Sequence, residues 1–336
     1  MQSLKACMIS LFNRLLFDII HARYLLECFI TILPGILLGI IYRTPLFFMA
    51  SFLAIASIMP YNKSYNKKYL TLLSLLFISL FSFVFAHQPH QGSDLYWLCL
   101  LAISLTFGFL EAHLPLLKSL FSWLFIGMLY GTIQFGHYGV SFIKYLQILV
   151  VAVIGILLFL SIVKTEPLKT QTVQFKFQWY FIIRYSKYFL FLIIASAVLW
   201  ISQLNQPQWF LWSGLSVLSF VLSDVTEKMK KKIIASAIGI LLAYITMQLL
   251  PDGPYLQVIA YSGIALSLRG FRQYQHSLTI RCYFVVLFAG NHALAISQAR
   301  FYDVVFGGII GLFLSVILAK ADAILVNNAD KTPKSL

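Results

Sequence analysis

The sequence predicts an all-α integral membrane protein of about twelve transmembrane helices, built as two parallel repeats of six. Three observations predict this class: an apolar composition, a series of apolar runs of near-membrane length, and a one-sided distribution of basic residues. Of the 336 residues, 60% are hydrophobic and 11% are charged, whereas soluble domains average about 45–50% and about 25%. Twelve crossings would use about 240 residues, which leaves too few for a separate soluble domain.

Residues 1–24 predict a helix that lies along the membrane surface before the first crossing. One face carries apolar residues at helical spacing, namely Leu4, Met8, Leu11, Leu15 and Ile19. Charged residues such as Lys5 and Arg14 stand between them. This mixture is typical of an amphipathic juxtamembrane helix and not of a cleavable secretory signal.

Twelve apolar runs follow, and we interpret each as one crossing. They lie near residues 26–42, 46–60, 69–86, 95–110, 117–133, 145–163, 187–204, 208–222, 232–250, 255–268, 280–294 and 303–319. The second, fourth, eighth and tenth runs are short for a full crossing. Each of these four therefore crosses with little tilt, is extended by its neighbours, or forms a re-entrant segment.

The runs divide the chain after the surface helix into four further segments. We expect a first membrane repeat at 25–163, a cytoplasmic linker with a surface helix at 164–186, a second repeat at 187–320 and a cytoplasmic tail at 321–336.

The basic residues fix the expected orientation. If all twelve runs cross and the N-terminus is cytoplasmic, every Lys and Arg except Arg43, Lys144 and Arg300 falls on the cytoplasmic side. This split follows the positive-inside rule and places both termini in the cytoplasm. The formal charge of +14 therefore belongs to scattered loop residues beside a lipid bilayer. We expect no nucleic-acid partner, because the basic residues form no solvated patch.

An internal repeat is indicated by landmarks with a constant spacing. Three pairs are each 162 residues apart: Pro45 with Pro207, Pro89 with Pro251, and Arg14 with Lys176. Six crossings per repeat is an even number, so both repeats have the same orientation. This predicts a pseudo-twofold axis along the membrane normal, with the cargo path between the repeats and transport by alternating access between them.

Ionisable residues within membrane runs are rare and costly, so they are the first candidates for function. Arg281 lies at the cytoplasmic mouth of the eleventh run, and Asn291 and His292 lie near its outer end. Arg281 either binds an anionic cargo or extends to the membrane surface as many long basic side chains do. Asn291 and His292 either bind cargo and handle protons, since histidine titrates near neutral pH, or only close a short outer loop.

Two further sets complete the candidate site. Arg300 and Asp303 are three residues apart at the entry to the twelfth run, so they can pair on one helix face. That pair is either an element of coupling and gating or a helix-entry ion pair. Trp212, with Trp200 and Trp209, flanks the outer loop between the seventh and eighth runs. These rings form either an interfacial aromatic belt or a stacking wall for a planar cargo.

Most enzyme chemistry is not indicated. The sequence has no GxxxxGK[ST] phosphate loop, no HExxH and no GxSxG, and its four cysteines lack metal-ligand spacing. We expect no cofactor and no metal site. His90 and Asp94, four residues apart on an outer loop, leave a membrane-embedded acyltransferase that modifies the envelope as the weakest alternative.

Three segments of the second half follow one another in a familiar order. They are WSGLSVL at 212–218, KKIIASAIG at 231–239 and RFYDVVFGGIIG at 300–311. The last holds Arg300, Asp303, Gly307 and Gly311. This order resembles the fusaric acid resistance (FUSC) and aromatic acid exporter superfamily over about residues 187–320. The chain departs from larger relatives because its central connection is too short for a soluble domain.

The resemblance implies a bacterial inner-membrane exporter of small, often aromatic, organic acids that is driven by the proton-motive force. Under this interpretation Arg281 draws the carboxylate from the cytoplasm, Trp212 stacks on the cargo, and Asn291 contributes to binding. His292 with Arg300 and Asp303 would handle protons or gate the outer side. Distant relatives are organic-anion channels, so a channel is the main alternative. The oligomeric state is not indicated.

Overall fold

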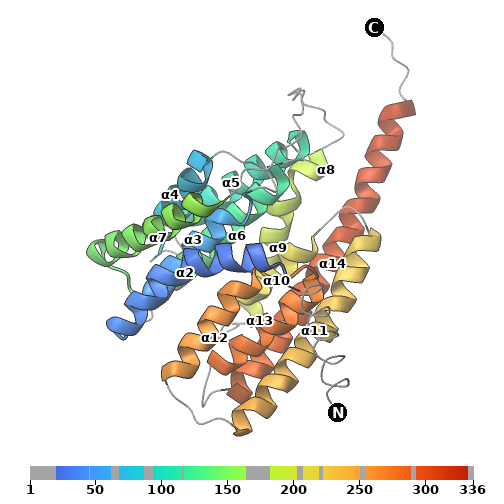
Figure 1. The fold of residues 1–336 in the computed structure, drawn as a ribbon. Helices are drawn as coiled ribbons and strands as arrows, with labels where there is room; N and C mark the ends of the chain where they lie inside the picture. The colour runs from blue at the N-terminus through green and yellow to red at the C-terminus, as the bar shows by residue number, and fades with distance from the viewer. Residues whose placement is uncertain are drawn as a thin grey trace. The chain divides into compact units, whose positions relative to one another are not determined.

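A computed structural model describes residues 20–44, 46–61, 68–86, 94–114, 117–163, 182–202, 207–218, 222–249, 254–288 and 293–331. These residues form thirteen helices and no strand apart from an isolated antiparallel bridge between Ile20 and Phe271 (Figure 1). The class is therefore all-α, as the composition predicts.

The helices run in two series of six, with one short helix between them. The first series is α2 (Ala22–Ile41), α3 (Leu46–Ile58), α4 (Lys68–Val84), α5 (Asp94–His113), α6 (Lys118–His137) and α7 (Phe142–Ile162). After the short α8 (Ile182–Tyr185) come α9 (Lys187–Ser202), α10 (Pro207–Val217), α11 (Leu222–Leu249), α12 (Pro254–Ser267), α13 (Tyr274–Phe288) and α14 (Ala293–Lys331). Each expected apolar run overlaps one of the twelve longer helices.

Within the described residues, four stretches are long and apolar enough to cross a membrane. They are Ala22–Ile41, Phe142–Ile162, Leu222–Leu249 and Ile296–Leu325. Leu46–Ile58, Lys68–Val84, Leu98–His113, Lys187–Val198 and Val258–Ser267 are shorter apolar helices. The fourth expected run, which looked short at 95–110, belongs to a helix of 20 residues.

Several helices extend beyond their expected runs. The helix expected at 232–250 begins at Leu222, the one expected at 280–294 begins at Tyr274, and the last continues through the expected tail to Lys331. Apolarity marks only the part of a helix that lipid or protein covers. Lysine, glutamate and alanine are good helix formers, so these helices continue into polar sequence.

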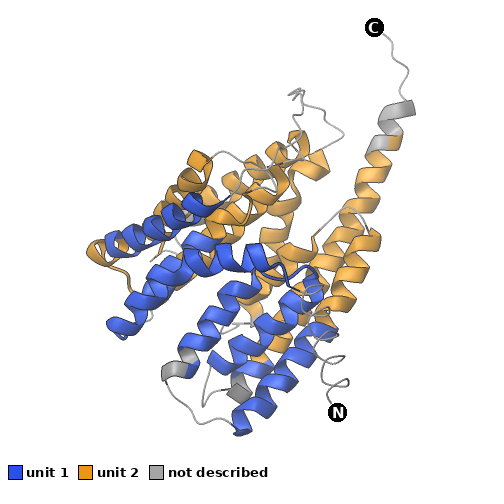
Figure 2. Ribbon diagram, viewed as in Figure 1, with its two compact units in different colours: residues 1–55, 146–164, 234–298 blue, residues 56–145, 165–233, 299–336 orange. Residues whose placement is uncertain are grey.

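Residues 1–19, which carry most of the expected surface helix, lie outside the described residues, as do residues 164–181 of the expected linker. The chain divides into two compact units, each assembled from separate stretches (Figure 2). Unit 1 comprises residues 1–55, 146–164 and 234–298, and unit 2 comprises residues 56–145, 165–233 and 299–336.

Unit 1 holds α2, α12 and α13, together with most of α3, α7 and α11. α12 packs against both α2 and α13. The Ser51 hydroxyl donates to the Ile32 carbonyl at 3.0 Å, and the Tyr261 hydroxyl donates to the Phe48 carbonyl. These bonds join α2, α3 and α12 in one packed group.

Unit 2 holds α4, α5, α6, α8, α9 and α10, together with most of α14 and the first part of α11. Its core is rich in phenylalanine, including the fully buried Phe125, Phe191 and Phe210. α10 and α14 approach very closely. A Cβ added at Gly307 would lie 2.4 Å from the Phe210 carbonyl oxygen, and one at Gly311 would lie 2.5 Å from that of Gly214. Only glycine permits this backbone contact.

Candidate functional site

The expected site residues fall in different places. Arg281 lies on α13 in unit 1, whereas Trp212 on α10 and both Arg300 and Asp303 on α14 lie in unit 2. Asn291 and His292 lie outside the described residues, and so does His90. The structure therefore brings Trp212, Arg300 and Asp303 into one compact unit and leaves Arg281 in the other.

Arg281 is buried and does not extend to the surface. Its guanidinium donates to the Ser267 hydroxyl at 3.2 Å and to the Ser277 hydroxyl at 3.1 Å, and it reaches the Ser267 carbonyl oxygen at 3.4 Å. The side chain is 9% exposed. These contacts hold the end of α12 against α13, so the alternative of a surface-seeking arginine does not apply.

A stack of one guanidinium and two indole rings stands at the centre of the unit 2 site. The Arg300 guanidinium carbon lies 3.8 Å from the centre of the Trp209 ring. Trp209 in turn stacks on Trp212, with ring centres 6.0 Å apart and planes 11° apart. The two tryptophans are three residues apart on α10, which places them on one helix face. A cation over an indole face contributes about 0.5–2 kcal/mol.

Further aromatic side chains surround this stack. Tyr130 of α6 meets Trp209 edge-on, with ring centres 5.8 Å apart, and Trp123 meets Trp212 in the same way at 5.8 Å. A small hollow of about 10 Å³ lies beside them, lined by Ile126, Leu129, Tyr130, Leu211, Trp212 and Leu215. That volume holds about one water molecule, so in this conformation the hollow is too small for a cargo molecule.

The expected ion pair between Arg300 and Asp303 is not formed. Within the part of the chain that the structure describes, no ion pair joins the two, and Nε of Arg300 and Oδ2 of Asp303 have no hydrogen-bond partner. Both side chains are buried, at 5% and 2% exposure. The Arg300 guanidinium lies instead over the Trp209 ring of α10.

A buried lysine adds a second cation to the same unit. Lys232 of α11, 3% exposed, donates to the carbonyl oxygen of Ser213 at 2.6 Å and to its hydroxyl at 2.7 Å. The Ser213 hydroxyl donates to the Val304 carbonyl at 2.6 Å. Ser213 follows Trp212 in the chain, and Val304 follows Asp303. These hydrogen bonds therefore place Lys232 near the indole stack. In the sequence, Lys232 is one of the basic residues expected on the cytoplasmic side, and nothing there indicates that its side chain is buried.

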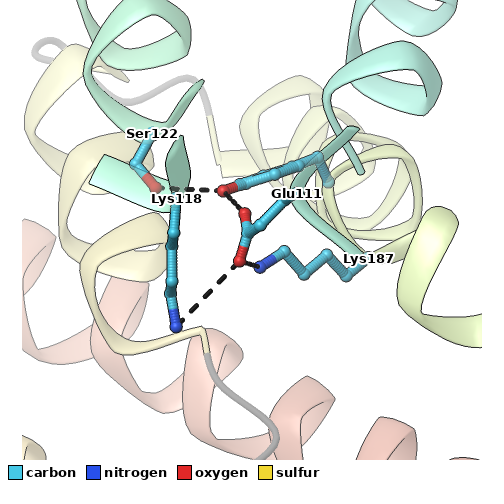
Figure 3. A network of polar contacts seen from close by, with 5 residues as sticks. Glu111, Lys118, Ser122 and Lys187 are labelled. Carbon is cyan, nitrogen blue, oxygen red and sulfur yellow. Dashed lines mark hydrogen bonds and ion pairs between the residues drawn. The ribbon is translucent and has the colours of Figure 1, made fainter. Parts of the chain in front are cut away.

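Sequence reasoning also missed a polar cluster at the end of α5 (Figure 3). Lys187 Nζ donates to one Glu111 oxygen and the Tyr188 hydroxyl donates to the other. Ser122 of α6 lies 3.0 Å from the same hydroxyl. Lys118 Nζ lies 4.0 Å from Glu111. In the sequence, Glu111 is an isolated acidic residue at the end of an apolar run. Its partners lie on α6 and α9, so the cluster forms only when these helices pack beside α5.

Unit 1 contains its own buried ion pair. Glu27 of α2 lies 3.3 Å from a guanidinium nitrogen of Arg269, which follows α12, and Arg23 donates to the same carboxylate at 3.0 Å. The Arg269 guanidinium also lies over the Tyr24 ring, 4.6 Å from its centre. It also lies 5.7 Å from the centre of the Phe159 ring, so one carboxylate and two aromatic faces contact the guanidinium.

Comparison with known proteins gives one match. Residues 193–314, from within α9 to within α14, match the family described as fusaric acid resistance protein-like. No curated protein and no solved structure matches the chain. The matched range contains Trp209, Trp212, Lys232, Arg300 and Asp303.

Proposed function

We propose, on the premise that residues 193–314 belong to the fusaric acid resistance protein-like (FUSC) superfamily, that the chain exports small organic acids. The match and the apolar helices support a multi-pass membrane protein with a transport role. Aromatic acids as cargo, the proton-motive force as energy source, the bacterial inner membrane as location and cytoplasmic termini are parts of the proposal.

One observation carries the proposal: a buried arginine that lies over Trp209, whose ring stacks on Trp212, and that forms no ion pair with a carboxylate among the described residues. An aromatic acid presents a carboxylate and a planar ring. A guanidinium binds a carboxylate through directed N–H bonds, and an indole face stacks on a ring. Arg300 has an unpartnered Nε, and Trp209 and Trp212 supply the faces.

The charge balance of this region favours an anion. Arg300 is buried, forms no ion pair with a carboxylate among the described residues, and has an Nε without a hydrogen-bond partner. A buried charge without a counter-ion costs several kcal/mol. An organic anion would supply a counter-charge to Arg300, whereas a cationic cargo would not. Arg281 remains a candidate for the first contact with the carboxylate in unit 1.

An internal duplication is also part of the proposal, and the composition of the units supports it. With the 162-residue offset, α2–α7 correspond in order to α9–α14. Unit 1 then combines the first, second and sixth helices of the first repeat with the third, fourth and fifth of the second, each for most of its length. Unit 2 combines the complementary helices. A duplicated chain whose repeats each contribute to both units accounts for this pattern.

The proposal is tested in a deletion strain. We expect the strain to become sensitive to a set of aromatic and other organic acids, and the full-length protein to restore efflux that an uncoupler abolishes. Arg300→Ala should reduce that efflux at least about tenfold, since one charge-assisted hydrogen bond contributes about 1.5–3 kcal/mol. Arg300→Lys keeps the charge but loses the planar stack, so we expect an intermediate rate.

Arg272→Ala is the matched control, because Arg272 is exposed. Detergent-solubilised variants are checked by size-exclusion chromatography before rates are compared. Efflux of every tested acid at the wild-type rate by Arg300→Ala would refute the site. Steady anion current through the wild-type protein without a proton gradient would instead identify a channel.

A further inference from the structure

The ion pairs Glu27–Arg269 and Glu111–Lys187 join corresponding helices with the charges exchanged. In unit 1 the acid lies on α2 and the base follows α12; in unit 2 the base lies on α9 and the acid lies on α5. The 162-residue offset matches α2 with α9 and α12 with α5. The structure therefore offers a matched comparison between two buried ion pairs.

The two pairs differ in how many of their groups can exchange a proton. An arginine stays protonated at any pH that proteins meet, and the Arg269 guanidinium is also held by the Tyr24 ring. The unit 2 cluster consists of a carboxylate, an ammonium and a phenol, each of which can gain or lose a proton. In Glu27–Arg269 only the carboxylate can thus exchange a proton, whereas in Glu111–Lys187–Tyr188 every member can.

Helix ends reinforce this difference. Glu111 lies in the last turn of α5, where the helix dipole disfavours an anion. Arg269 lies just beyond the last turn of α12, where the dipole favours a cation. The local field therefore supports the charge at the end of α12 and opposes the charge at the end of α5. Of the two carboxylates, Glu111 is the one whose neutralisation its own helix favours.

We propose that Glu111 binds the coupling proton of the transport cycle, an inference that rests on the proton-driven export proposed above. A proton taken up by one Glu111 oxygen gives a neutral carboxylic acid and leaves the Lys187 ammonium without its counter-ion. Burying a lone ammonium is costly, so protonation favours a second conformation in which Lys187 reaches water or an anion. Release of the proton restores the carboxylate and the pair.

The surroundings of Glu111 provide a route for the proton. Lys187 and Tyr188 of α9 face it directly, and Lys118 faces it from the start of α6. The Lys118 side chain is 56% exposed, so it links the cluster to solvent. His113 of α5 and Tyr185 of α8, whose rings stack 5.5 Å apart, also lie on these helix ends, as does Arg184 of α8, which pairs with Asp322.

The first test is transport by the full-length protein in proteoliposomes, with radiolabelled benzoate as the probe. Glu111→Gln keeps the size of the side chain but cannot bind the proton. We expect stimulation of benzoate transport by a pH gradient to fall about tenfold or more, within the usual range of a coupling free energy. Benzoate exchange at equal pH on both sides should persist. Glu227→Gln, which removes the carboxylate of an exposed pair with Lys231, should keep the stimulation.

The second test needs no transport substrate. Infrared spectra of the reconstituted protein, recorded over a range of pH, should show a protonated-carboxyl band that Glu111→Gln removes and Glu227→Gln retains. If Glu111→Gln does not fold, Glu111→Gln/Lys187→Met, which removes both charges, replaces it in both tests with the same expected losses.

The two tests separate this inference from the proposed function. A band lost in Glu111→Gln, with no gradient-driven transport by the wild type, would support proton binding and refute proton-driven export. If Glu111→Gln keeps both the protonated-carboxyl band and the stimulation of transport by a pH gradient, the assignment of Glu111 is overturned. The export proposal would then stay intact.

Discussion

Ser213 is the residue through which three helices of unit 2 are hydrogen-bonded together. It lies on α10, accepts two hydrogen bonds from Lys232 of α11 and donates one to the Val304 carbonyl of α14. It follows Trp212 directly, and Val304 follows Asp303. The position of the indole stack against α14 therefore depends on one small hydroxyl.

We predict that Ser213→Ala lowers stability by about 1–3 kcal/mol, because a buried ammonium and a buried carbonyl each lose a partner. The measurement is thermal unfolding of the detergent-solubilised protein, where the variant should unfold at a lower temperature. Ser161→Ala is the control: that hydroxyl is exposed and bonds only to the Leu158 carbonyl of its own helix. A Ser213→Ala protein as stable as wild type would show that the network is dispensable.

At the scale of elements, the contact between α10 and α14 decides whether the proposed site exists. Gly307 and Gly311 let the two backbones approach to a distance at which any Cβ would overlap a carbonyl oxygen, and a Cβ at Gly214 would overlap the Phe191 ring. Trp209 and Arg300 lie on the same two helices. The glycines that resemble a family pattern in the sequence thus have a local physical role. They allow the close helix packing that the cation–indole stack requires.

We predict that Gly311→Ala forces α10 and α14 apart and costs about 1–3 kcal/mol, the usual cost of overpacking. The backbone of Gly214, which the new methyl group would meet at 2.5 Å, cannot rotate away as a side chain could. Stability is measured by thermal unfolding, and efflux is measured beside it. Ile309→Ala, at a 46% exposed position of the same helix, should change stability by less than about 0.5 kcal/mol. Equal effects of the two substitutions would contradict the close-packing argument.

At the scale of the whole molecule, the duplication and the orientation of the repeats remain predictions that labelling can test. Both repeats begin on the cytoplasmic side if each has six crossings, so corresponding loops face the same side. The charge distribution agrees with this arrangement, because basic residues concentrate on the side expected to be cytoplasmic. A single missed crossing would reverse every later segment.

We predict the sidedness of single cysteines introduced at four exposed positions, in a chain whose native cysteines are replaced by serine. Cysteine at Arg43 or Lys144 should react with a membrane-impermeant maleimide in intact cells, whereas cysteine at Lys228 or Lys320 should react only after permeabilisation. Labelling of position 228 from outside would show that the second repeat is not parallel to the first.

From the sequence alone we could predict the all-α membrane class, the rough position of each helix and some of the candidate residues, Trp212, Arg300 and Asp303 among them. These properties follow from hydropathy and charge along short stretches, which local sequence fully records. The tertiary structure alone decided which buried charges are partnered. Glu111 meets Lys187, 76 residues away, and Arg300 turns to Trp209 and not to Asp303. Such partners depend on which helix ends and faces pack together, and no local pattern of residues carries that information.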